Sequence, residues 1–145
     1  MARSAVTILT AGALALGLTT ACGDSDPAEI AAEASEFGGI VLPEGATVLG
    51  TRKDEDRTTL YRLTLSTDPE GVRHLLSAST ITAPPERAFE VGETTIAGPP
   101  LETSPMLLRV ADDYQRPDGK SIARIVIVDE RDPGLRYVHI QLSDT

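Results

Sequence analysis

Two segments of the chain alternate between apolar and polar residues, as half-buried β-strands do. In residues 58–66, Tyr61, Leu63 and Leu65 occupy alternate positions, and polar side chains lie between them. Residues 135–142 repeat this pattern. Each segment therefore predicts a strand that faces a core on one side only.

Three further strands are predicted from the remaining apolar segments. Residues 48–53 precede a polar turn and should pair with 58–66 as an antiparallel hairpin. Residues 106–111 alternate, whereas 122–129 form a continuous apolar run rich in β-branched residues, which suits a central strand. Two predicted turns, 112–120 and 130–134, join these segments to the last strand.

One helix is predicted between the second and third strands, ending near Ser79. Asp68 is a favourable N-cap, and Pro69 suits the first helical position. The apolar residues recur at helical spacing on one face: Val72, Leu75 and Leu76. This stripe should pack on the sheet.

The order of these elements predicts an α+β fold. One helix should cover one face of an antiparallel sheet of about five strands, in the order strand-strand-helix-strand-strand-strand. Residues 82–105 contain five prolines and are long for a connection in a small domain, which indicates either a functional segment or a mobile one. Phe89 and Val91 are expected to hold this segment against the body.

The first residues of the chain follow the order of an export signal. Arg3 precedes the uncharged and mostly apolar residues 5–18, and small residues follow. A run of this length fits a secretory signal better than a membrane span of about 20 residues. Residues 1–21 are therefore expected to be removed as a signal peptide.

The sole cysteine lies where this apolar run ends. The sequence Leu18-Thr19-Thr20-Ala21-Cys22-Gly23 resembles the lipobox of bacterial lipoproteins, and the arginine-rich composition resembles small uncharacterised lipoproteins of high-GC Gram-positive bacteria. The resemblance implies cleavage before Cys22 and a diacylglycerol on its sulfur. Thr19 departs from the leucine that the family favours at this place.

The resemblance also implies a domain organisation. Residues 22–39 would be the lipidated N-terminus followed by a tether or short helix, and residues 40–145 a single α+β domain. The short helix would begin with Asp26 as its cap and Pro27 in its first turn, and end at Gly38 and Gly39. A partly apolar face of Ile30, Ala34 and Phe37 accompanies these signals.

Charge and composition restrict the partners. The net charge of −9 over 145 residues disfavours nucleic acid, which needs a basic surface. Removal of residues 1–21 deletes Arg3 and makes the charge −10, so anionic lipid headgroups would repel the body. The membrane would then be reached through the diacylglycerol on Cys22, on the outer face of the cell membrane.

The search for chemistry gives no catalytic, metal or cofactor residues. Neither His74 nor His139 has a second histidine at zinc-ligand spacing, and the nucleophile elbow of serine hydrolases and phosphate-binding loops are missing from the sequence. Acidic pairs such as Asp112-Asp113 and Asp129-Glu130, and the run Asp54-Glu55-Asp56, are expected in solvated turns.

The non-core side of two predicted strands supplies the candidate binding face, formed by Arg62, Thr64, Tyr137, His139 and Gln141. We therefore expect a non-enzymatic, lipid-anchored envelope protein that binds an unknown envelope protein or ligand. Two alternatives are a cell-wall hydrolase that uses the loop carboxylates and a spacer lipoprotein without a ligand.

Overall fold

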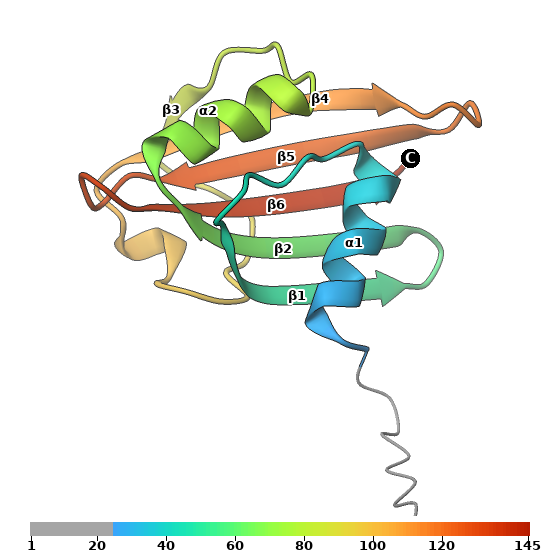
Figure 1. Ribbon diagram of the computed structural model, residues 1–145, viewed down its shortest axis with the longest axis horizontal. Helices are drawn as coiled ribbons and strands as arrows, with labels where there is room; N and C mark the ends of the chain where they lie inside the picture. The colour runs from blue at the N-terminus through green and yellow to red at the C-terminus, as the bar shows by residue number, and fades with distance from the viewer. Residues whose placement is uncertain (1–24) are drawn as a thin grey trace, which may run out of the picture.

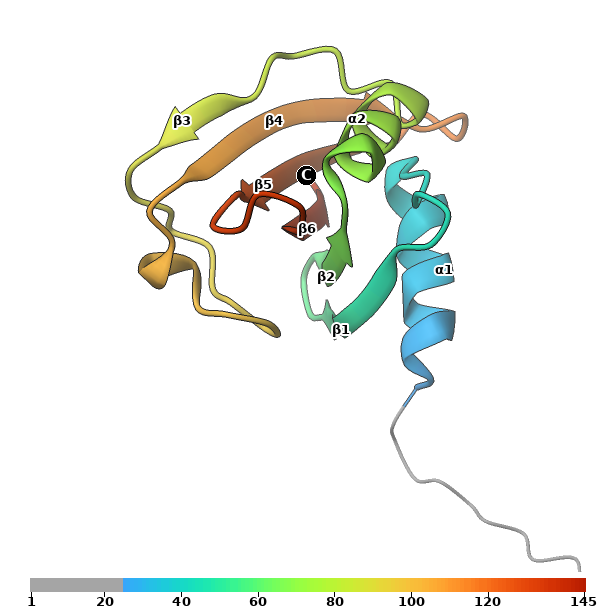
Figure 2. The ribbon, with the colours of Figure 1, turned by 60° about the vertical axis from the view of Figure 1, so that its left-hand side comes forward.

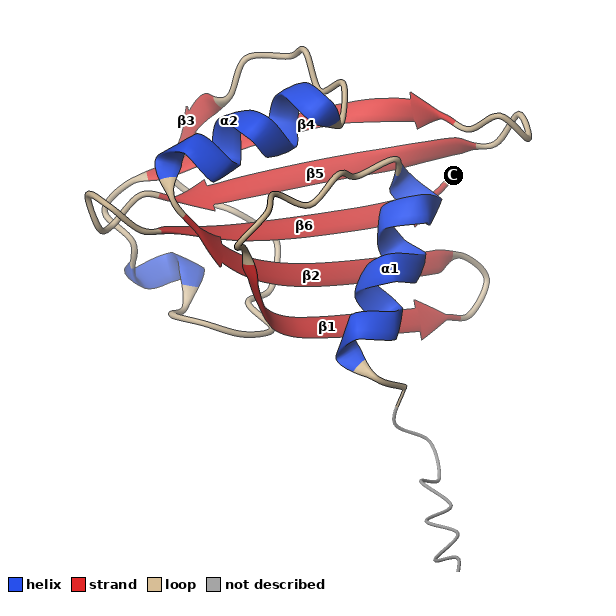
Figure 3. Ribbon diagram, viewed as in Figure 1, coloured by secondary structure: helices blue, strands red, loops and turns tan. Residues whose placement is uncertain are grey.

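The chain folds into one antiparallel sheet with two helices on one of its faces (Figures 1 and 3). The computed structural model describes residues 25–145, so the expected signal peptide and Cys22 lie outside the described residues. The sheet has six strands in the order β1-β2-β6-β5-β4-β3. The α+β prediction is confirmed, with one strand and one sheet-packed helix more than expected.

The elements have the following bounds. The helices are α1 (Pro27–Gly38) and α2 (Pro69–Ala78), with a short 3₁₀ turn, η1 (Leu101–Thr103). The strands are β1 (Thr47–Glu55), β2 (Thr59–Thr67), β3 (Glu86–Ala88), β4 (Leu107–Gln115), β5 (Ser121–Asp129) and β6 (Arg136–Asp144). The prediction of a loop over residues 112–120 is therefore partly wrong, because β4 continues through Gln115.

The two faces of the sheet carry different cores. On the helix face, the face on which α1 and α2 pack, alternate residues of the central strands form the main core: Tyr61, Leu63, Leu65, Ile122, Val126, Val128, Val138, Ile140 and Leu142. The predicted alternation in β2 and β6 is confirmed. On the opposite face, Leu101, Leu107 and Ile127 form a second, smaller core with Val91 against it.

Helix α1 forms where its start and stop signals predicted, and it packs on the sheet. The carboxylate of Asp26 accepts from the backbone N–H of Ala28, and Gly39 closes the helix at a φ of 61°. Ala31 and Ala34 are buried against the sheet. Glu33 accepts hydrogen bonds from Lys53 (2.9 Å) and Tyr61 (3.0 Å), which fastens the helix across β1 and β2. The packed core therefore includes residues before the boundary expected at residue 40.

A buried arginine on the helix face joins both helices to the sheet. Arg124, on β5, is 2% exposed and donates to both carboxylate oxygens of Asp112, at 2.7 and 2.6 Å. Its Nη1 donates to the carbonyl oxygens of Gly38 (3.1 Å) and Ser79 (2.9 Å), at the C-terminal ends of α1 and α2. Its guanidinium lies over the ring of Tyr114. One side chain thus satisfies carbonyls that two helix ends leave free.

Candidate functional site

A proline-rich segment between β3 and η1 covers the face of the sheet opposite the helices. We call residues 89–100 the strap and the face beneath it the strap face. Figure 2 shows the strap on the side of the sheet away from α1, running from β3 towards β1. A Cβ on Gly50 of β1 would lie 2.6 Å from the Cβ of Ala97, so the strap approaches the strand there too closely for a side chain.

The strap changes the setting of the candidate binding face. All five of its residues lie on the strap face, as the alternation predicted. However, Thr64 is fully buried and His139 is only 7% exposed, whereas Arg62, Tyr137 and Gln141 are half-buried. The expected open face is in fact a covered one, because a segment without periodic pattern lies over it.

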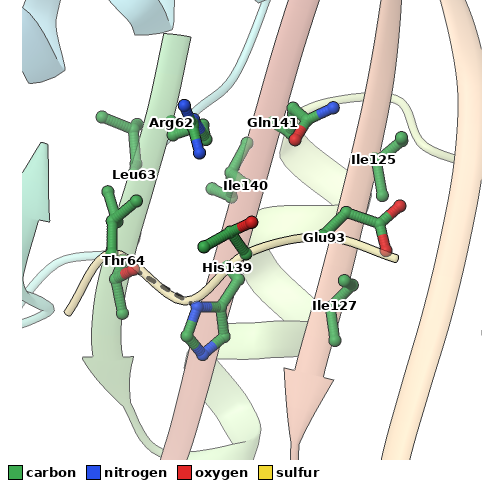
Figure 4. Close-up of a pocket in the computed structure, with 11 residues that line it drawn as sticks. Arg62, Leu63, Thr64, Glu93, Ile125, Ile127, His139, Ile140 and Gln141 are labelled. Atoms are coloured by element: carbon green, nitrogen blue, oxygen red, sulfur yellow. Dashed lines mark hydrogen bonds between the residues drawn. The ribbon is translucent and has the colours of Figure 1, made fainter. Parts of the chain in front are cut away.

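A small cavity lies between the strap and the sheet (Figure 4). It is lined by Arg62, Thr64, His139 and Gln141 of the candidate face, by Ile125 and Ile127 of β5, and by Glu93, Thr94 and Ile96 of the strap. Its volume is about 10 Å³, the space of one water molecule. Tyr137 does not line this cavity; it lies beside Gly98 of the strap instead.

Three buried polar atoms at this cavity have no hydrogen-bond partner. They are Arg62 Nε, Glu93 Oε2 and His139 Nε2, and the described part of the chain contains no other buried side-chain nitrogen or oxygen without one. Leaving such a group unsatisfied costs about 1–3 kcal/mol. The cavity is therefore the place in the described structure where a further hydrogen-bonding group is most needed.

His139, Arg62 and Glu93 also make hydrogen bonds within the protein through their other polar atoms. His139 Nδ1 shares a hydrogen bond of 3.3 Å with Thr64 Oγ1. Arg62 Nη2 donates to Asp54 at 3.0 Å, and Arg109 Nη2 donates to Glu93 Oε1 at 3.0 Å. Burial lowers the pKa of His139 and outweighs the opposite effect of Asp129. The imidazole is therefore neutral near pH 7.

Asp129 occupies the end of β5 on the strap face and is fully buried. Ser104 Oγ donates to its Oδ1 at 2.5 Å, and Arg131 Nε donates to its Oδ2 at 2.8 Å. Burial alone would raise the pKa of Asp129, but the hydrogen bonds from Arg131 and Ser104 lower it overall. Arg131 also donates to the carbonyl oxygen of Pro100, which fastens the end of the strap.

The acidic residues expected in solvated turns lie mainly in strands and are paired with arginines. Asp54 in β1 pairs with Arg52 and Arg62, Asp112 in β4 with Arg124, and Asp129 in β5 with Arg131. In the same acidic groups, Glu55 pairs with Lys53 and Glu130 with Arg136. Within residues 25–145, no group of three or more His, Cys, Asp or Glu side chains is arranged to hold a metal ion.

The sequence did not single out Glu93 or Arg109, which pin the strap near its start. Neither residue belongs to a motif, and Glu93 lies outside every helix and strand. The expectation for Val91 is confirmed by its place in the smaller core. The expectation for Phe89 is wrong, since its side chain is 82% exposed and lies against the guanidinium of Arg87.

Comparisons with protein-family models, curated proteins and solved structures give no match to this chain. None of the helices in the described residues is long and apolar enough to cross a membrane. The sequence and the structure of the protein are therefore the basis for its proposed function.

Proposed function

We propose that this protein is exported, anchored to the outer face of the cell membrane by a diacylglycerol on Cys22, and serves there as a non-enzymatic binding module. The observation that carries the proposal is the order Arg3, apolar residues 5–18 and Ala21-Cys22-Gly23. The described fold is consistent with it, because its first helix is capped at Asp26, four residues after the cysteine. A lipid on Cys22 would therefore lead almost directly into the folded domain.

The short connection limits how far the domain stands from the lipid. A segment of four residues spans at most about 14 Å. The N-terminal end of α1 would then lie near the headgroups, with acidic residues around it at Asp24, Asp26 and Glu29. These charges are repelled by anionic lipid, so the acyl chains must supply the attachment, and two chains suffice for stable anchoring.

Binding is favoured over catalysis by the state of the polar groups. The carboxylates that a hydrolase would use are held by arginines, and the pKa values of Asp54 and Asp129 are lowered, Asp54 chiefly by its hydrogen bond from Arg62. A general acid needs the opposite shift. The buried polar atoms under the strap that lack hydrogen-bond partners instead favour a bound molecule. A spacer lipoprotein has no need of such a site.

The anchoring proposal is tested with Cys22→Ala expressed in a bacterium that processes lipoproteins. The variant should move from the membrane fraction to the soluble fraction, while the wild-type mature chain should carry the mass of a diacylglycerol on its first residue. Ser25→Ala is the matched control and should stay in the membrane. Thr19→Leu restores the residue that the lipobox family favours and should increase the processed fraction. A mature wild-type chain with a free thiol at Cys22 would overturn the proposal.

A further inference from the structure

The cavity under the strap brings together all the unsatisfied buried polar side-chain atoms of the described residues. Arg62 Nε comes from β2, His139 Nε2 from β6 and Glu93 Oε2 from the strap. Figure 4 shows Glu93 over the isoleucines of β5, with Arg62 and Gln141 towards one end and the imidazole towards the other. Three separate segments of the chain therefore each contribute one unsatisfied polar atom to residues that line the same cavity.

We propose that this cavity is a binding site for a hydroxyl group of a small neutral polyol or sugar, which enters when the strap lifts. The inference rests on the binding role proposed above, and it is independent of the lipid on Cys22.

The charges around the cavity indicate a neutral ligand. Arg62 is already paired with Asp54, and Glu93 with Arg109. His139 is buried and unprotonated near neutral pH. A cationic or anionic ligand would therefore find no free opposite charge, and its own charge would lose water without compensation.

The atoms and the volume indicate a hydroxyl group. Arg62 Nε carries a proton to donate and Glu93 Oε2 can only accept, and a hydroxyl group can bond either atom because it both accepts and donates. The cavity of about 10 Å³ accommodates one group of the size of water. Ile125 and Ile127 below and Ile96 above offer apolar surface to the C–H groups of a sugar ring.

The strap has few hydrogen bonds to the rest of the fold, as expected of a segment that opens and closes over a site. Among the described residues, residues 89–99 make no backbone–backbone hydrogen bond to the rest of the fold. The strap is held by the Glu93–Arg109 ion pair, by Thr95 Oγ1, which accepts from the N–H of Leu101 at 2.9 Å, and by packing. At its end, Arg131 donates to the carbonyl oxygen of Pro100. Segments with few backbone hydrogen bonds open at low free-energy cost. Gly92 and Gly98 flank the part that covers the cavity.

The test is a titration of the full-length chain, purified in detergent, followed by two-dimensional NMR. Glucose is the neutral probe, glucosamine and glucose 6-phosphate are its charged counterparts, and tetrahydropyran is the same ring without hydroxyl groups. Glucose should produce saturable shifts in the amides of residues 93–98 and in the imidazole of His139. The other three probes should bind at least tenfold more weakly.

Two matched variants locate the site. Glu93→Gln retains the contact with Arg109 but places an amide donor where Oε2 accepts, and the loss of one buried hydrogen bond should weaken glucose binding about tenfold. Glu102→Gln makes the same change of charge at an exposed residue of η1 and should leave binding unchanged. Arg109→Met frees the strap and should increase the apparent affinity, because less free energy is then needed to open it.

The inference fails if glucose gives no saturable shift, which would mean that only water occupies the cavity. It also fails if Glu93→Gln and Glu102→Gln bind glucose equally well, or if the charged probes bind as tightly as glucose. Fractionation of Cys22→Ala separates this outcome from the anchoring proposal, since that measurement does not depend on the cavity.

Discussion

Arg124→Met tests whether one buried guanidinium holds both helices on the sheet. The substitution keeps the length of the side chain and removes every hydrogen bond that Arg124 makes. It leaves the Asp112 carboxylate, whose side chain is 22% exposed, without its bidentate partner. It also leaves the carbonyl oxygen of Gly38, at the end of α1, without a donor. The carbonyl oxygen of Ser79, at the end of α2, keeps only the hydroxyl of Thr80, at 2.7 Å.

The expected loss is a large fraction of the stability of the domain. Removal of one partner from a buried ion pair costs about 3–5 kcal/mol, and the orphaned carbonyl of Gly38 costs about 1–3 kcal/mol. These contributions overlap, because Asp112 gains access to water once the arginine is absent. We expect a decrease of about 4–6 kcal/mol in the free energy of unfolding, for a domain whose total is about 5–15 kcal/mol.

Urea denaturation followed by circular dichroism measures this loss, and Arg116→Met is the matched control. Arg116 also donates to a carbonyl at the end of α1, that of Phe37 at 3.3 Å, but its carboxylate partner is the surface residue Asp118. Its removal should cost less than about 1 kcal/mol. A loss in Arg124→Met no greater than that of the control would refute the reasoning. Addition of Asp112→Leu to Arg124→Met should restore part of the stability, because it removes the unpaired charge.

Three further predictions concern Gly39, His139 and Asp129. Gly39→Ala should cost about 2 kcal/mol or more in urea denaturation, since φ is +61° and a Cβ would lie 2.5 Å from Cζ of Tyr114; an unchanged midpoint would contradict this. Burial holds the pKa of His139 below its ordinary 6.5, so its stabilising contribution is complete above about pH 6.5 and is lost as the pH falls towards the lowered pKa. The loss of stability just below pH 6.5 should be smaller in His139→Gln and persist in the exposed control His74→Gln. The pKa of Asp129 lies below 3.8, so its contribution is present above about pH 4 and is lost at lower pH; Asp129→Asn should unfold with a flatter dependence on acid than the wild type, and an equally steep curve would exclude this role.

The sequence patterns predicted β2 and β6 because each of these strands directs apolar residues to the helix face and polar residues to the strap face. Tyr61, Leu63 and Leu65 alternate with polar residues since β2 has the helices on one face and the strap on the other. The apolar run 122–129 indicated a central strand, and β5 is paired on both sides. Local signals also predicted both ends of α1, namely Asp26 as the N-cap and Gly39 as the residue that ends the helix.

The parts that the sequence did not predict depend on contacts between distant residues. Helix α1 packs through Ala31 and Ala34, whose small side chains add little to an apolar stripe. Arg124 interrupts an apolar strand, and nothing local shows that two helix ends meet there. The strap has no periodic pattern, so its position over His139 and the role of Glu93 could be found only in the structure.

The place of the last strand has a consequence for the order in which the molecule assembles. β6, residues 136–144, lies between β2 and β5 and supplies the only strand pairing between the β1–β2 hairpin and the other three strands in the described sheet. A chain that emerges from its N-terminus cannot complete the sheet until residues 136–144 are available, and pairings so distant in sequence form slowly. Until β6 is in place, the β1–β2 hairpin and the strands β3, β4 and β5 are two separate pieces of sheet, each with an unpaired edge.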